Sequence, residues 1–197
     1  IEKALADIQL PPGYTWNFHK EAKEKQERYW EFAESLILAL ILIFAVMAGL
    51  FESVQRAIAL MIALPFALSG AWWTLYLTGT DFDRPASVGL LLLIGIVVNN
   101  GIVLIDYANR LRQSGMERTQ ALLKAAEHRF RPIAITALTT IIGMIPLTLS
   151  ASSEMGMSYK SFGLTLIGGM ASGTLLTLLV VPVFYTLFDD AQQAIRN

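Results

Sequence analysis

The sequence predicts an all-α membrane protein built on five transmembrane helices, and three observations lead to this fold class. Only 16% of the 197 residues are charged and 54% are hydrophobic, whereas about a quarter of a soluble domain is charged. Five uncharged stretches of 17 to 28 residues cover more than half of the chain, and roughly 20 residues suffice for a helix to span a bilayer. Residues 36–50 are almost continuously apolar, unlike the alternating strands of a membrane barrel.

This composition also excludes several classes of protein. The low and uneven charge excludes a soluble globular enzyme and a disordered chain. The net charge of -1 excludes a nucleic-acid binder of the usual basic kind. The chain has no cysteine, so a disulfide framework and a thiolate metal site are excluded as well.

The first 33 residues precede the membrane part. Residues 1–10 have helical spacing, residues 10–13 (Leu-Pro-Pro-Gly) read as a turn, and residues 14–18 alternate like a strand. A lone strand of five residues needs partners, so we expect residues 1–18 to be the end of a larger domain. Opposite charges three and four residues apart then predict a solvated lead-in helix over 19–33.

The membrane domain is expected over residues 34–188. The five helices are expected at about 34–52, 57–78, 86–107, 132–151 and 162–187. A short amphipathic helix over about 111–127 should lie along the membrane surface, in contact with lipid. The side that holds this helix and the tail 189–197 carries eight Lys or Arg residues, while the opposite short loops hold only two. The positive-inside rule therefore makes this side cytoplasmic.

Polar residues inside the third predicted helix are the first candidates for function. Asn99 and Asn100 lie near its middle, about 100° apart around the helix, so both cannot face one neighbour. They are either hydrogen-bonded packing residues or part of a functional site. Asp106 lies near the cytoplasmic end, where it is either solvated or paired with Arg110 at i+4. We expect that Asp106 does not titrate in function.

The fourth predicted helix carries a small and polar face. Pro132 suits a helix start, Thr136, Thr140 and Gly143 share one face, and Pro146 should kink the helix. Threonines in such helices often bond only their own backbone, which is the alternative to a functional role.

Glycines that permit close helix approach are Gly95, Gly143, Gly169 and Gly173, of which the last two form a small-xxx-small pair. The two histidines, His19 and His128, lie outside the spans and far apart in sequence, so no metal site is expected. No glycine-rich phosphate loop followed by Lys-Ser or Lys-Thr is present, so the sequence does not support direct use of ATP.

Several motifs, in order, resemble the C-terminal part of a resistance-nodulation-division (RND) efflux permease of the AcrB-like multidrug type. The motifs are Leu-Pro-Pro-Gly-Tyr at 10–14, residues 63–71, residues 95–106, residues 129–132 with Thr136, residues 143–147 and residues 181–184. The five helices then correspond to the eighth to twelfth of such a permease. Residues 1–18 correspond to a remnant of its periplasmic α/β porter subdomain, so the chain looks like a piece of a longer protein.

The resemblance implies a secondary active transporter rather than an enzyme, located in the bacterial inner membrane and driven by the proton-motive force without a cofactor. It implies a homotrimer with a periplasmic adaptor and an outer-membrane channel, exporting drugs or amphiphilic small molecules by proton antiport. A tenth-helix pattern without the acidic residues of the heavy-metal branch favours drugs over metal ions. The alternatives are a lipid exporter or protein-translocation auxiliary of the same superfamily, or a non-transporting membrane scaffold.

The resemblance also assigns proton-relay candidates, namely Asn99, Asn100, Thr136 and Arg129. The paired aspartates that take up protons in such permeases belong to a helix outside this chain. The threonine and arginine near that pair map to Thr136 and Arg129. The lysine maps to Asn99, which is a departure, because Asn carries no charge. Loss of that cation should raise the pKa of a neighbouring carboxylate, while Asn99 can still hydrogen-bond it.

Overall fold

The computed structural model describes residues 18–149 and 159–196, and within these ranges the secondary structure is helical, with turns between the helices. The chain divides into two compact units, Ile1–Ser35 and Leu36–Asn197. The turn expected at 10–13 and most of the strand expected over 14–18 lie outside the described residues. Phe18, the last residue of that predicted strand, is instead the first residue of a helix.

The predicted lead-in helix and the first predicted span form a single helix, α2, over Phe18–Phe51. Ser35, at the predicted junction, donates its hydroxyl to the carbonyl of Glu31 within the same helix at 2.9 Å. Among the α2 residues whose burial is described, only Met47 and Phe51 are buried. Glu52 follows with a φ of 47°, a left-handed conformation that cannot continue a right-handed helix.

The second predicted span is not one helix, which corrects the expected helix over 57–78. It consists of α3, Val54–Met61, and α4, Leu64–Leu77. Pro65 explains the break, because it has no N–H to donate to the carbonyl four residues earlier and its ring crowds that carbonyl. Just before it, the Ala63 N–H bonds the Leu60 carbonyl at 3.1 Å, three residues back instead of four.

The third predicted span, α5, covers Arg84–Gln113 and is longer than expected at its C-terminal end. Asp83 caps its start, because the carboxylate accepts the N–H of Ala86 at 3.0 Å. The helix stops before Gly115, whose φ of 93° marks a left-handed turn.

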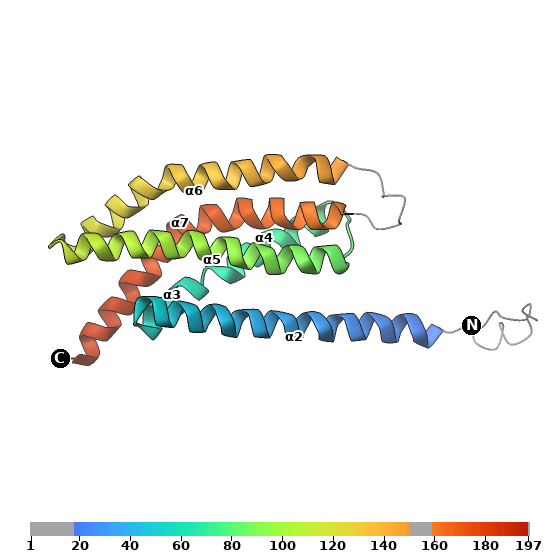
Figure 1. Ribbon diagram of the computed structural model, residues 1–197, viewed down its shortest axis with the longest axis horizontal. Coiled ribbons are helices and arrows are strands. Elements are labelled where there is room, and N and C mark those ends of the chain that lie inside the picture. The colour runs from blue at the N-terminus through green and yellow to red at the C-terminus, as the bar shows by residue number, and fades with distance from the viewer. Residues whose placement is uncertain (1–17, 150–158, 197) are drawn as a thin grey trace, which may run out of the picture. The chain divides into compact units, whose positions relative to one another are not determined.

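The fourth span, α6, covers Arg118–Leu149 and begins well before the predicted start at Pro132. The separate surface helix predicted over 111–127 is therefore wrong, because residues 111–113 finish α5 and 118–127 begin α6. Pro132 lies inside α6, where it removes one backbone hydrogen bond without ending the helix, and α6 changes direction along its N-terminal part (Figure 1).

The first turn of α6 is stabilised by Glu117. Its carboxylate accepts the backbone N–H groups of Thr119 and Gln120, each at 3.1 Å. These two hydrogen bonds favour the ionised form and lower the pKa of Glu117 below its ordinary value. The cap explains why α6 starts here, in a charged segment that hydropathy alone does not recognise as part of the span.

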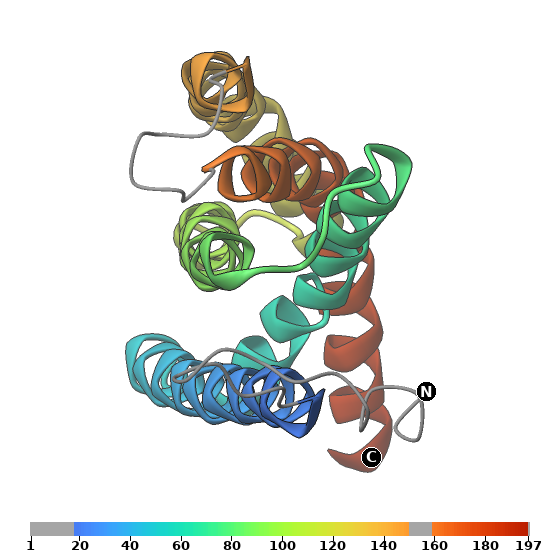
Figure 2. The same cartoon turned by 90° about the vertical axis from the view of Figure 1, so that its right-hand side faces the viewer.

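The last helix, α7, covers Lys160–Arg196, longer than the predicted 162–187, and Pro182 lies inside it. It is the central helix of the second unit, with α4, α5 and α6 packed around it (Figure 2). The fold class is confirmed, because five helical segments are long and apolar enough to cross a membrane. Within the most apolar window of each, α5 and α7 are 56% and 50% buried, whereas α6 is only 11% buried.

Candidate functional site

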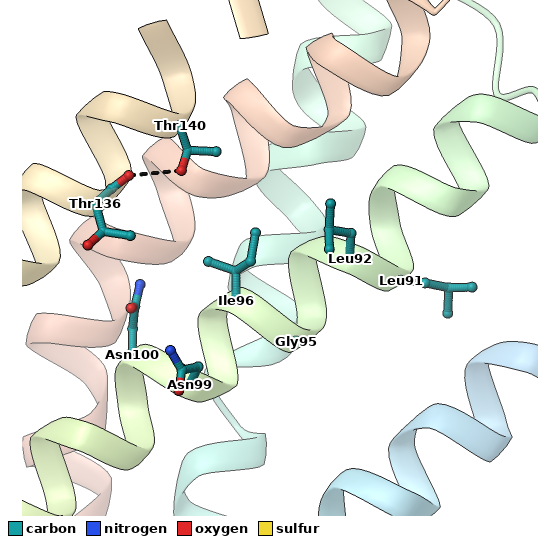
Figure 3. Close-up of a pocket in the computed structure, with 8 residues that line it drawn as sticks. All are labelled: Leu91, Leu92, Gly95, Ile96, Asn99, Asn100, Thr136 and Thr140. Atoms are coloured by element: carbon teal, nitrogen blue, oxygen red, sulfur yellow. Dashed lines mark hydrogen bonds between the residues drawn. The ribbon is translucent and has the colours of Figure 1, made fainter. Parts of the chain in front are cut away.

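A cavity of about 390 Å³ lies between α5 and α6. Its lining from α5 is Leu91, Leu92, Gly95, Ile96, Asn99 and Asn100, and its lining from α6 is Thr136 and Thr140. Figure 3 shows the polar side chains gathered at one end of this cavity and the aliphatic side chains toward the other. The structure thus brings together three of the four proton-relay candidates: Asn99, Asn100 and Thr136.

The two asparagines occupy different environments, as their 100° separation predicts. Asn100 is only 8% exposed and extends from α5 toward α6 (Figure 3), whereas Asn99 is exposed in this chain. Neither carboxamide forms a hydrogen bond with another residue in the described ranges 18–149 and 159–196. Buried polar groups need hydrogen-bonding partners. These two amide groups near the middle of a span can therefore bind a group from outside this chain or water.

The threonine hydroxyls donate to their own helix, as the alternative reading of the sequence predicted. Thr136 donates to the Pro132 carbonyl at 3.0 Å, and Thr140 donates to the Thr136 carbonyl at 2.9 Å (Figure 3). Each hydroxyl oxygen keeps lone pairs that can accept a further hydrogen bond. The cavity therefore offers amide donors and oxygen acceptors, and its lining carries no charged side chain.

Arg129, the fourth relay candidate, is not among the residues that line this cavity. Its guanidinium carbon lies 5.0 Å from the centre of the Tyr107 ring, a cation–π contact. Its buried Nε atom has no hydrogen-bond partner among the described residues. In this chain Arg129 therefore joins α6 to α5 near the C-terminal end of α5, and the cavity lies closer to the N-terminal end of α5 and the C-terminal end of α6.

Asp106 pairs with Arg110, one turn later on α5, at 3.0 Å. The side chains are 45% and 73% exposed respectively, so this is a helix-end ion pair of small energetic value. The pairing confirms the structural interpretation that the i+4 spacing predicted.

The four predicted packing glycines fall into two groups. A Cβ atom at Gly169 would collide with the side chain of Leu93, and one at Gly173 would lie 2.9 Å from Ala67 Cβ. Both glycines thus allow close contact of α7 with its neighbours. Gly95 and Gly143 have no neighbouring side chain within 4 Å of the corresponding position, and Gly95 lines the cavity instead.

A polar network near the C-terminal end of α5 was not predicted. Tyr185, 4% exposed on α7, donates its hydroxyl to Asn109 Oδ1 and accepts from Arg112 Nη1, both at 2.8 Å. The partners are more than 70 residues away in sequence, and no local pattern connects them.

At the other end of α5, the Ser161 hydroxyl of α7 donates to Asp83 Oδ1 at 2.5 Å. One partner of this contact, Asp83, can be recognised in the sequence as a helix cap, because Asp followed by Arg84-Pro85 is typical of a helix N-terminus.

Comparison with known proteins gives a consistent result. The chain is similar to the swarming motility protein SwrC of Bacillus subtilis (strain 168), with 34% identity over 185 residues that cover 94% of this chain and 18% of SwrC. It is also similar to the multidrug resistance protein MdtC of Proteus mirabilis (strain HI4320), with 31% identity over 194 residues that cover 98% of this chain and 19% of MdtC. The chain thus spans about a fifth of the length of these relatives.

Among solved structures, the chain is similar to a heavy metal efflux pump, with a TM-score of 0.75 and 26% identity over 95% of this chain and 19% of the pump. Proteins of this kind are inner-membrane permeases, and the five spans give this chain the same location. A sequence profile described as the AcrB/AcrD/AcrF family (ACR_tran) matches residues 1–189. The chain therefore belongs to the AcrB/AcrD/AcrF family of RND permeases.

Proposed function

We propose that this chain supplies the uncharged wall of a proton relay in an efflux transporter. The observation that carries the proposal is the pair of unbonded carboxamides, Asn99 and Asn100, facing an uncharged cavity near the middle of α5. Family membership supports transport as the activity. Its power source would be the proton-motive force, with no cofactor.

The cavity residues would act by hydrogen bonding. An amide N–H of Asn99 or Asn100 can donate to a carboxylate of another helix or to a water that carries a proton. The oxygens of Thr136 and Thr140 can accept from the same water. Because no cation lies in the cavity lining, a carboxylate that docks there would be held by amide dipoles alone. Its pKa would be higher than beside a lysine.

The proposed cargo is a drug or another amphiphilic small molecule, exported by proton antiport. MdtC, a relative of this chain, is named as a multidrug resistance protein, and the cavity lining contains no acidic side chain that would hold a metal cation. The working assembly would be a homotrimer that joins a periplasmic adaptor and an outer-membrane channel.

The test uses alanine substitutions in the full-length transporter, reconstituted in vesicles with an imposed pH gradient. We expect Asn99→Ala, Asn100→Ala and Thr136→Ala to slow proton-coupled efflux of an amphiphilic dye. A lost hydrogen bond to a charged group corresponds to about 1.5–3 kcal/mol, or roughly ten- to a hundredfold in rate.

Thr139→Ala is the matched control for Thr136→Ala. Thr139 is an exposed threonine of α6 that bonds its own helix in the same way, at 2.9 Å to the Ile135 carbonyl, but it does not line the cavity. Normal coupled efflux from both Asn99→Ala and Thr136→Ala would refute the relay role.

A further inference from the structure

The outward face of α4 carries a group of exposed aromatic side chains, which we call the aromatic patch. It consists of Trp72, Trp73 and Tyr76, whose exposed fractions are 47%, 62% and 78%. The opposite face of α4 is buried against α7, and there the small residues Ala67 and Ala71 are at most 1% exposed. A helix that turns its small residues inward and its largest apolar ones outward reverses the arrangement of a water-soluble protein. The outward face is therefore suited to contact with lipid or with another apolar surface.

The aromatic patch lies at one end of the helix bundle. It occupies the last two turns of α4, and the centre of the Trp72 ring lies 4.8 Å from that of Phe82, in the turn that leads to α5. At this end the Asp83 carboxylate also accepts a hydrogen bond from Ser161, so the first turns of α5 and α7 lie side by side. The other exposed Trp or Tyr that the structure describes in the unit Leu36–Asn197 is Tyr159, directly before α7. Within the described part of this unit, exposed Trp and Tyr residues thus gather at a single end.

Each residue of the aromatic patch joins an apolar ring to one polar group. The indole N–H groups of Trp72 and Trp73 and the hydroxyl of Tyr76 form no hydrogen bond with another described residue. Trp73 and Tyr76 contact each other edge to face, with ring centres 6.1 Å apart. Such amphipathic rings are enriched where hydrocarbon meets water, because the ring then lies in an apolar medium while the polar group stays hydrated. The patch therefore has the chemistry of a membrane–water boundary.

The length of α5 agrees with a boundary at this level. The helix starts at Arg84 and carries no further charged residue until Asp106. At 1.5 Å per residue these two charges are about 33 Å apart along the helix, close to the roughly 30 Å of a bilayer's hydrocarbon core. Arg84 follows Phe82, the ring partner of Trp72, by two residues. The apolar part of α5 therefore extends through the hydrocarbon from the level of the aromatic patch.

We propose that the aromatic patch docks in the headgroup region of the bilayer and anchors the end of α4 and the α4–α5 turn at that depth. The occupant is bilayer lipid. The rings lie against the first methylene groups of the acyl chains, and carbonyl or phosphate oxygens of the lipid accept the indole N–H groups. Lipid is favoured over a second protein surface because the patch continues the exposed side of a span, Ala57–Leu77, and lies where that span ends. The inference does not depend on the proposed transport activity.

Spin labels measure the depth of the aromatic patch. Ser69 and Asp81 are exposed residues on either side of it, one on α4 and one in the α4–α5 turn. Ser69→Cys, Trp73→Cys, Tyr76→Cys and Asp81→Cys are introduced one at a time into the full-length transporter freed of any other cysteine. Each protein is labelled and reconstituted in vesicles of phosphatidylethanolamine and phosphatidylglycerol. The collision rate of the label with oxygen, which concentrates in hydrocarbon, is then compared with that of a polar nickel complex, which stays in water.

We expect oxygen collisions to dominate at Ser69→Cys and nickel collisions at Asp81→Cys, with the two patch positions between them. Trp73 and Tyr76 lie about 6 and 10 Å beyond Ser69 along a helix, so the ratio of the two collision rates should change in that order. Shielding of both patch labels from both reagents would show that another protein surface covers the patch. Nickel access equal to that of Asp81→Cys would place the patch in water. Either result would overturn the proposal.

A second experiment tests whether the polar groups of the patch provide the anchor. The Trp73→Leu/Tyr76→Leu variant keeps this face apolar but removes an indole N–H and a hydroxyl, and the label at Asp81→Cys reports the result. We expect oxygen collisions at this label to rise and nickel collisions to fall, because leucine prefers the hydrocarbon and draws the turn toward it. Phe130→Leu is the matched control, since Phe130 is 58% exposed but has no polar group. An unchanged label in the double variant, or an equal change in the control, would overturn the anchoring role.

Discussion

Replacing Gly169 with alanine tests the packing of α5 against α7 directly. The added methyl group would lie 2.8 Å from Leu93 Cδ1 and 2.9 Å from Leu93 Cγ, well inside van der Waals contact. Leu93 is fully buried, so its side chain cannot turn out toward the surroundings. The substitution therefore forces either an unfavourable rotamer or a separation of the two helices.

The magnitude follows from two opposing effects. Overpacking a well-packed interior costs about 1–3 kcal/mol, while replacing glycine by alanine inside a helix returns about 0.5–1 kcal/mol. Gly143→Ala is the matched control, because no side chain lies within 4 Å of the new methyl position and only the favourable effect remains. We expect the stabilities of Gly169→Ala and Gly143→Ala to differ by about 1–3 kcal/mol.

Thermal unfolding of the purified protein in lipid nanodiscs provides the assay, with Leu93→Ala as the compensating change. Leu93→Ala alone leaves a cavity and costs about 2–5 kcal/mol, but the methyl group added by Gly169→Ala would occupy part of that space. The double variant should be more stable than the sum of the single changes by about 0.5–3 kcal/mol. An unchanged melting temperature for Gly169→Ala, or simple additivity in the double variant, would refute the close contact of Gly169 with Leu93.

Two further predictions concern the C-terminal end of α5 and the start of α6. Tyr185→Phe keeps the ring but removes the hydroxyl that bridges Asn109 and Arg112, so we expect the free energy of unfolding to fall by about 1–3 kcal/mol. The control is Tyr107→Phe, because the Tyr107 hydroxyl has no hydrogen bond to a described residue, and its cost should be smaller. Equal losses of stability in the two variants would contradict the bridge. Because the pKa of Glu117 is lowered in the folded chain, its capping contribution is present above the unfolded pKa and is lost as pH falls through the folded pKa. Hydrogen-exchange protection of the first turn of α6 should fall in that acid range. In Glu117→Gln the protection should no longer follow this titration. The same pH dependence in both proteins would exclude the cap.

The number and approximate places of the spans were predictable because the absence of charge is a property of the sequence alone. Helix ends were less predictable, because they depend on local hydrogen bonds that hydropathy does not contain. The capping of α6 by Glu117 and the break before Pro65 are of this kind. In both cases the residue responsible is visible in the sequence, but the pattern of apolar residues does not predict that it starts or breaks a helix.

The candidate site was predictable in part for a similar reason. Asn99, Asn100 and Thr136 stand out as polar residues in apolar helices, and two helices adjacent in sequence pack together in the structure. Helix rotation was not predictable, so the burial of Asn100 and the exposure of Asn99 had to come from the structure. The bonds of Tyr185 to Asn109 and Arg112 span 76 and 73 residues, and only the folded chain brings these groups together.

Residues that meet across α5 and α7 differ by a constant 76 in number, as in Gly89 with Thr165, Leu93 with Gly169, Val97 with Gly173 and Asn109 with Tyr185. This constant offset restricts where the length of the chain can change. One residue inserted between positions 89 and 109, or between 165 and 185, would rotate everything beyond it by about 100°. Every later glycine would then turn away from the side chain that it accommodates. Insertions in the turn at residues 114–117 change the offset but leave each helix face intact. Gaps in alignments of functional relatives should therefore gather in that turn and be absent from residues 89–109 and 165–185.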